Sequence, residues 1–138
     1  FVGLCENGAL AVGVPFATNN QIGFLVTDGD ASIKAICDSG GTETSTDTGV
    51  DLADGSVSGG TISGDRRLGF VVTGTGKVEF YVDRVLKVTT TDNIPTSQLA
   101  TWVAAVAGEA VANKVDCDYL FTAAQRQTDG MVQYSDQV

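Results

Sequence analysis

Residues 68–90, LGFVVTGTGKVEFYVDRVLKVTT, constrain the fold more than any other part of this chain. They form three short runs of alternating apolar residues, each separated from the next by a turn signal. This pattern predicts a β-meander. Its apolar face carries Leu68, Phe70, Val72, Val78, Phe80 and Val82, and its polar face carries Lys77, Glu79, Tyr81 and Asp83. We therefore expect a sheet with one buried face and one solvated face.

Other segments also alternate, and none has a convincing helical repeat. The expected strands outside the meander are 1–5, 21–28, 30–38, 48–52, 61–63, 101–108 and 113–123. Asp28-Gly29 between two of these strands is a hairpin signal, and Asn93 and Pro95 mark 90–99 as a crossover loop. In 30–38, Ile33, Ala35 and Cys37 are expected on one face, with Lys34 and Ile36 on the other.

Short strands separated by many turns predict an all-β fold, with two antiparallel sheets in a sandwich. A jelly roll is the version we prefer. We expect residues 1–123 to form this domain and residues 124–138 to form an extended C-terminal tail. Because Phe1 already lies in an alternating run, we also expect the domain to have further strands before it.

Charge narrows the classes of partner. The chain has 138 residues and 8 Lys+Arg against 17 Asp+Glu, for a net charge of −9. Nucleic acid and anionic membrane surfaces would repel such a chain, so neither is expected as a partner. No apolar run is long enough to cross a bilayer.

The three cysteines, Cys5, Cys37 and Cys117, are far apart in the sequence, and the chain has no histidine. Zinc bound by sulfur and nitrogen is therefore not expected. All three lie in apolar-patterned strands, which predicts small core residues. One disulfide between two of them is the alternative, although three free thiols would fit assembly in a reducing compartment better than secretion.

Three motifs carry a resemblance to a known family. They are Val78-Glu79-Phe80-Tyr81-Val82-Asp83, Asn93-Ile94-Pro95 and Val115-Asp116-Cys117-Asp118-Tyr119. Together with the strands around them, they resemble the concanavalin A-like (jelly-roll) sandwich domain of structural proteins from tailed bacteriophages. The motifs are fold signatures and include no active-site signature. Where the family has an Asp-Gly turn, this chain has Asp83-Arg84, so Arg84 occupies a position that prefers positive φ and glycine.

Glu79 and Asp83 are candidates for a catalytic pair, because glycosidases on this fold carry an E-x-D-x-x-E strand motif. Here the spacing is E-x-x-x-D, and Tyr81 stands where the middle acid would be. A solvated strand face is the better interpretation, so no catalytic residue is predicted. Asp116 and Asp118 share a strand face, but no calcium-loop pattern accompanies them, and no metal or other cofactor is predicted.

The resemblance implies a non-enzymatic virion protein, assembled in the host cytoplasm. It would act as a capsid decoration, cement or fibre-associated domain, and its partners would be copies of itself, for example in a trimer, and other virion proteins. The candidate interface residues are Trp102, Ala105, Ala107, Met131 and Tyr134. The alternative is a carbohydrate-binding module that attaches to a glycan on the host surface, and a third, weaker option is a glycosidase.

Overall fold

The computed structural model describes residues 1–6, 20–27, 30, 32–51, 66–104, 117 and 119–124. Within these ranges the chain is all-β and contains no helix. The strands are β1 (Val2–Glu6), β2 (Gln21–Leu25), β3 (Ser32–Ser39), β4 (Thr42–Asp51), β5 (Leu68–Thr73), β6 (Lys77–Val82), β7 (Val85–Thr90) and β8 (Leu99–Val103).

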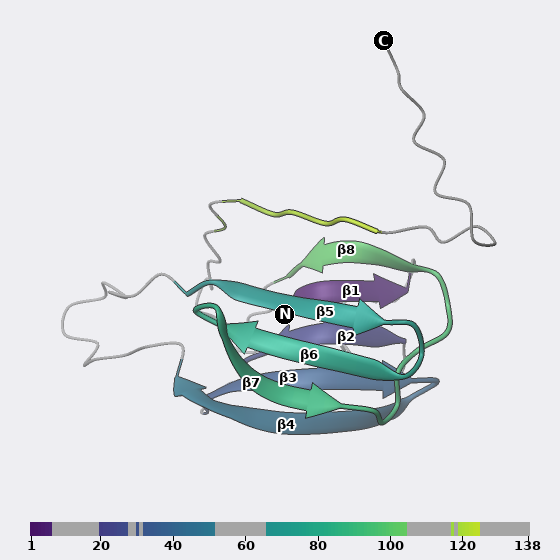
Figure 1. Cartoon of the computed structure of the whole chain (residues 1–138), viewed down its shortest axis with the longest axis horizontal. Helices are drawn as coiled ribbons and strands as arrows, with labels where there is room; N and C mark the ends of the chain where they lie inside the picture. Colours follow the sequence, from purple (N-terminus) through teal and green to yellow (C-terminus); the bar gives the residue numbers. More distant parts are fainter. Residues whose placement is uncertain are drawn as a thin grey trace, which may run out of the picture.

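The strands form two antiparallel sheets that face each other (Figure 1). One sheet has the order β4-β3-β2-β1-β8, and the other has the order β5-β6-β7. The chain builds the larger sheet from β1 to β4, crosses to the smaller sheet for β5 to β7, and returns to place β8 beside β1. This arrangement confirms the predicted all-β fold with two antiparallel sheets.

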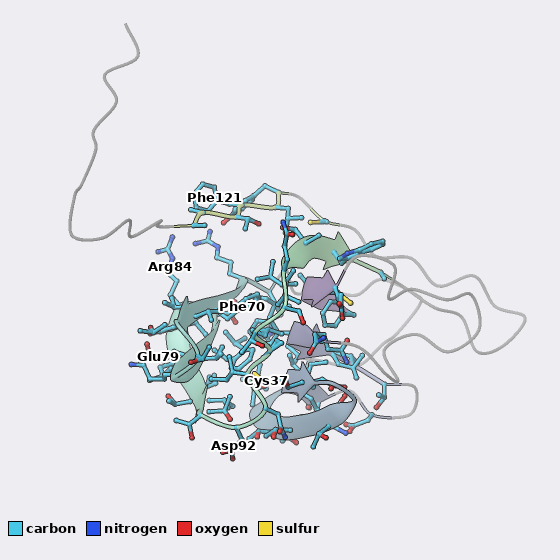
Figure 2. The ribbon with its side chains drawn as sticks, turned by 90° about the vertical axis from the view of Figure 1, so that its right-hand side faces the viewer. Cys37, Phe70, Glu79, Arg84, Asp92 and Phe121 are labelled. Carbon is cyan, nitrogen blue, oxygen red and sulfur yellow. The ribbon has the colours of Figure 1, made fainter. Side chains whose placement is uncertain are left out.

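The core lies between the two sheets. Phe24 of the larger sheet meets Phe80 of the smaller sheet edge-on, with ring centroids 5.3 Å apart, and Phe70 lies 5.8 Å from Phe80. Cys37 is buried in the same cluster, and burial raises the pKa of its thiol to about 12. Figure 2 shows Cys37 and Phe70 between the sheets. Aromatic edge contacts of this kind add to the stabilisation that burial provides.

The predicted meander is confirmed as β5, β6 and β7. Val78, Phe80 and Val82 are almost completely buried, which confirms the predicted apolar face of the central strand. At the end of β5 the predicted apolar face is not fully buried. Val72 is 38% exposed although it shares the face of Phe70. The smaller sheet thus covers the core mainly with β6.

β4 is longer than expected. The predicted strand at 48–52 begins instead at Thr42, immediately after a tight turn in which Gly40 and Gly41 have φ values of 62° and 86°. Two glycines in succession permit such a turn at little steric cost. The strand was underestimated because it is an edge strand whose side chains are mostly exposed, so it carries little apolar alternation.

The outer face of the larger sheet is also buried. Ile36 faces away from Ile33, as predicted, yet both side chains have 0% exposure. Gly3 and Gly23 are paired across β1 and β2, and the ring of Phe1 covers both of them. A Cβ atom on Gly23 would lie 2.4 Å from the carbonyl oxygen of Val2, so a larger residue would not fit without movement of the backbone.

The predicted crossover loop connects β7 to β8 and is anchored by burial of Ile94 and Pro95. Asn93 has a φ of 50°, and its side-chain amide donates a hydrogen bond to Thr44 Oγ1 of β4 at 2.8 Å. The loop is therefore tied to the far edge of the larger sheet.

The expectation of a strand at 113–123 was wrong for the part that the structure describes. Residues 119–124 are not in a strand, although Thr122 Oγ1 lies 2.9 Å from Thr101 Oγ1 of β8. Tyr119 and Phe121, which the alternation placed on one strand face, are 73% and 80% exposed. Cys117 was expected in the core and is exposed, because this segment lies beside the sandwich edge rather than in a sheet.

Other predictions fall on residues that the structure does not describe. These are the hairpin turn Asp28-Gly29, the strand at 61–63 and the tail beyond residue 124.

Candidate functional site

The polar face of the meander was the first candidate for chemistry. Glu79 Oε1 lies 3.1 Å from Lys77 Nζ, and Asp83 Oδ2 lies 3.0 Å from Arg66 Nη1. Each of the two acids that were weighed as a catalytic pair thus has a cation of its own. A pair of glycosidase carboxyls instead needs one member that keeps its proton near neutral pH.

Asp83 is held in its ionised form. Its Oδ1 accepts a hydrogen bond of 3.0 Å from the backbone N–H of Arg67, and this bond is the main reason that the pKa of Asp83 is lowered. The hydrogen bond and ion pair with Arg66 lower it further. A carboxyl group with a lowered pKa is a poor proton donor at neutral pH.

The same residue begins the turn between β6 and β7. Asp83 and Arg84 have φ values of 53° and 68°, both in the left-handed region, as a type I′ turn requires. The backbone N–H of Asp83 also donates to the carbonyl of Arg67 at 2.8 Å. The predicted tight turn with Arg84 in the glycine position is thereby confirmed.

A shallow groove of about 280 Å³ lies beside this turn. We call it the arginine groove, and its lining residues are Arg67, Leu68, Gly69, Phe70, Val71, Tyr81, Arg84 and Tyr119. β5 and β6 supply most of the floor, because Gly69 pairs with Tyr81 across the two strands. Gly69 has no side chain and no atom within 4 Å of its Cβ position, which leaves the hollow over the sheet.

Neither of the two arginines of the groove forms an ion pair among the residues that the structure describes, although the charge of Arg67 helps to lower the pKa of Asp83. Arg66, next to them in the sequence, is paired with Asp83. Guanidinium groups bind carboxylates through two parallel hydrogen bonds, and they also stack on aromatic rings. With Tyr81 and Tyr119 alongside, the groove has the donors and the flat apolar surface to bind a ligand that carries a carboxylate.

Exposed apolar side chains surround the groove. Val71 is 52% exposed, Leu86 is 47% exposed and Val85 is 55% exposed. Figure 2 shows Arg84 and Phe121 at the same end of the molecule, opposite the end that carries Asp92. A group of exposed apolar residues beside two arginines is typical of a surface that contacts another protein.

The structure places only one of the predicted interface residues. Trp102 lies half-buried on β8, paired with Gly3 of β1, and its indole nitrogen has no hydrogen-bond partner within the described ranges. Ala105, Ala107, Met131 and Tyr134 lie outside the described residues. Their role at an interface therefore stays a prediction.

A second hollow, of about 350 Å³, lies at the end of β1 and β8 and is lined by Glu6, Gln98, Leu99 and Ala100. Glu6 accepts a hydrogen bond of 2.7 Å from the side-chain amide of Asn20. With one carboxylate that is already hydrogen-bonded, this hollow has fewer binding groups than the arginine groove.

A pair of acids faces outward at the opposite side of the larger sheet. Asp38 of β3 is buried, and Glu43 of β4 lies directly across from it. Burial raises the pKa of Asp38, although a hydrogen bond of 2.8 Å from Gly41 N–H partly offsets the effect. Burial also raises the pKa of Glu43, and the negative charge of Asp38 raises it further.

No group of three or more metal-ligating side chains occurs in the ranges that the structure describes. Asp116 and Asp118, the acids that share a predicted strand face, lie outside those ranges. All three cysteines are free, so the disulfide alternative is wrong here; Cys5 and Cys37 are buried as predicted. The described part of the chain also has no helix that could cross a membrane.

The arginine groove was missed at the level of sequence because its residues come from three separate segments. Arg66-Arg67 precedes β5, Arg84 sits in a turn, and Tyr119 was assigned to a strand. The one available signal was the presence of three arginines within 66–84 of a chain that has only 8 basic residues.

No family model matches the chain, and no match was found among the curated proteins or the solved structures.

Proposed function

We propose that the chain is a non-enzymatic structural protein of a virion, with a jelly-roll fold of the concanavalin A-like kind. It would be a capsid decoration, cement or fibre-associated domain that stabilises the particle through contacts with other copies and with the shell. The proposal draws on the sequence resemblance and on the all-β fold with two antiparallel sheets.

The observation that carries the proposal is the exposed apolar surface around the arginine groove. Val71, Leu86 and Phe121 project into solvent at one end of a chain that is otherwise strongly acidic. Contact with another protein would bury this surface. The ion pairs of Glu79 and Asp83 agree with a structural role for the face that was weighed as catalytic.

Particles of the virus that encodes the chain provide the test. The protein should sediment with purified particles in a fixed stoichiometry through a density gradient. The double variant Val71→Lys/Leu86→Lys should fold about as stably as the wild type, because the lysine at position 71 lies opposite Glu79. It should lose at least tenfold in particle occupancy. Absence of the wild-type protein from purified particles would overturn the proposal.

The second candidate is a carbohydrate-binding module. It is favoured by one feature, the two tyrosines and two arginines that line the arginine groove, because such groups bind the ring and the carboxylate of an acidic sugar. The isolated domain should then bind selected sugars on a glycan array, and Tyr81→Ala should remove the binding. A structural protein would show neither result.

A further inference from the structure

The left-handed turn supplies the first step of a further inference. A non-glycine residue at a φ of 68° lies in a region of backbone conformation that is strained for a side chain with a Cβ atom. Arg84 nevertheless occupies this position, and its side chain lines the groove beside Arg67. Strained residues of this kind cluster at active sites and ligand-binding sites. Arg84 has no acid partner among the described residues, so a carboxylate from outside the chain would be its natural ligand.

The second step is the pair of acids on the opposite side of the molecule. Asp38 and Glu43 are direct cross-strand partners, and like charges in such positions destabilise a sheet. Asp38 is only 2% exposed, whereas Glu43 is exposed on the edge strand β4. Exposed Asp47 and Asp51 add negative charge along the same strand. Lys34 lies opposite Asp47 and offsets part of the charge of Glu43. Its ammonium group is already bound by another carboxylate, so a cation from outside would relieve the repulsion that remains at Glu43.

We propose that the arginine groove of one copy binds the Glu43 edge of a second copy, in a head-to-tail contact. This inference rests on the proposed function, because self-association is part of it, and it names the two surfaces and their order. The groove lies beside β5 and the acidic edge is β4, so the two surfaces are at different ends of the same molecule (Figure 1). Each contact therefore leaves one free groove and one free edge, and further copies can add until a ring closes.

The charges of the two surfaces favour the head-to-tail contact over a symmetric contact between two β4 edges. Such a contact would place Glu43 and Asp47 of one copy against the same acids of another, and like charges on edge strands act against that pairing. The head-to-tail contact places carboxylates against arginines instead. Because each copy has a net charge of −9, copies repel one another overall, and a contact between locally complementary charges opposes this repulsion.

Neutral variants of the full chain test this order of contacts. The groove variant is Arg67→Gln/Arg84→Gln, and the edge variant is Glu43→Gln. By sedimentation velocity, the wild type should form species larger than a dimer as its concentration rises, while each variant alone should associate at least tenfold more weakly. An equal mixture should form a dimer and stop there, because the groove of one variant binds the intact edge of the other.

Lys87→Gln is the matched control. Lys87 is exposed on β7, has no ion pair among the described residues and does not line the groove, so its loss should leave association unchanged. A wild-type chain that stays monomeric at all concentrations would overturn the inference. So would association that is unchanged in the groove variant, or a variant mixture that stays monomeric.

Two further results separate this inference from the alternatives. Binding of polygalacturonate that depends on Arg67 and Arg84, without any effect of Glu43→Gln on self-association, would assign the groove to an acidic sugar and overturn the head-to-tail contact. Recovery of the groove variant in purified particles at the wild-type stoichiometry would also overturn it, while the proposed virion role would stand.

Discussion

The outer faces of the two sheets differ sharply. On the larger sheet the outward side chain of Ile36 is fully buried, and Gly3 and Gly23 fit closely beneath the ring of Phe1. On the smaller sheet, Val71 and Leu86 are about half exposed, and Gly69 opens onto empty space. The larger sheet is therefore packed on both faces, whereas the smaller sheet has one face available to a partner.

The largest expected effect comes from shortening an apolar side chain on each outer face. Ile36→Ala should lower the free energy of unfolding by about 2–5 kcal/mol, because it removes buried methyl groups and leaves a cavity. Val71→Ala should change it by less than about 0.5 kcal/mol, because the side chain is exposed. Urea unfolding of both variants measures the difference, and equal losses would show that the two faces are equally packed.

Glycine replacements compare the same faces through the backbone. Gly23→Ala should destabilise the fold by about 1–3 kcal/mol, because its Cβ would clash with the Val2 carbonyl and the Phe1 ring. Gly69→Ala should be neutral or should stabilise by up to about 1 kcal/mol, because it reduces the freedom of the unfolded chain at an open position. A stable Gly23→Ala protein would mean that β1 and β2 separate more easily than their spacing indicates.

This comparison also explains what the sequence could predict. Alternation located the meander and the inward side of β3, because burial on one face leaves a period of two in residues such as Ile33, Ala35 and Cys37. It found only the end of β4 and missed residues 42–47, whose exposed side chains carry no such period. It also misassigned Tyr119 and Phe121, since an alternating segment that has no sheet to join looks the same in sequence as a strand.

The candidate site was harder to predict for a related reason. The Asp83-Arg84 turn could be recognised because a tight turn is encoded by adjacent residues. The arginine groove instead depends on how β5, the turn and the segment at 119–124 meet in space. No local pattern records that proximity.

The next largest change in stability should come from relief of backbone strain in the turn between β6 and β7. It concerns the stability of the fold alone and not the binding proposed for the groove. Arg84→Gly should raise the free energy of unfolding by up to about 1 kcal/mol, because glycine adopts positive φ without a steric penalty. Arg84→Ala is the control, since it keeps a Cβ atom and should bring no such gain. Thermal melting can compare the two, and an equal gain in both variants would trace the effect to the charge rather than to the backbone.

The smallest expected change in stability comes from Asp38, the buried acid on the outer face of the larger sheet, and it depends on pH. The pKa of Asp38 is raised in the folded state, mainly by burial, so the folded protein holds this proton more tightly than the unfolded chain. Stability that depends on this proton is present below the ordinary pKa and is lost as pH rises through the raised pKa. Asp38→Asn keeps a side-chain oxygen to accept from Gly41 N–H and removes the charge, so it should be more stable than the wild type near neutral pH. Denaturation from about pH 3 to about pH 7 should show the two curves diverging as pH rises, by less than the cost of Ile36→Ala. Curves that stay parallel would mean that solvent reaches the side chain of Asp38. The outer face of the larger sheet would then be less completely buried at Asp38 than at Ile36.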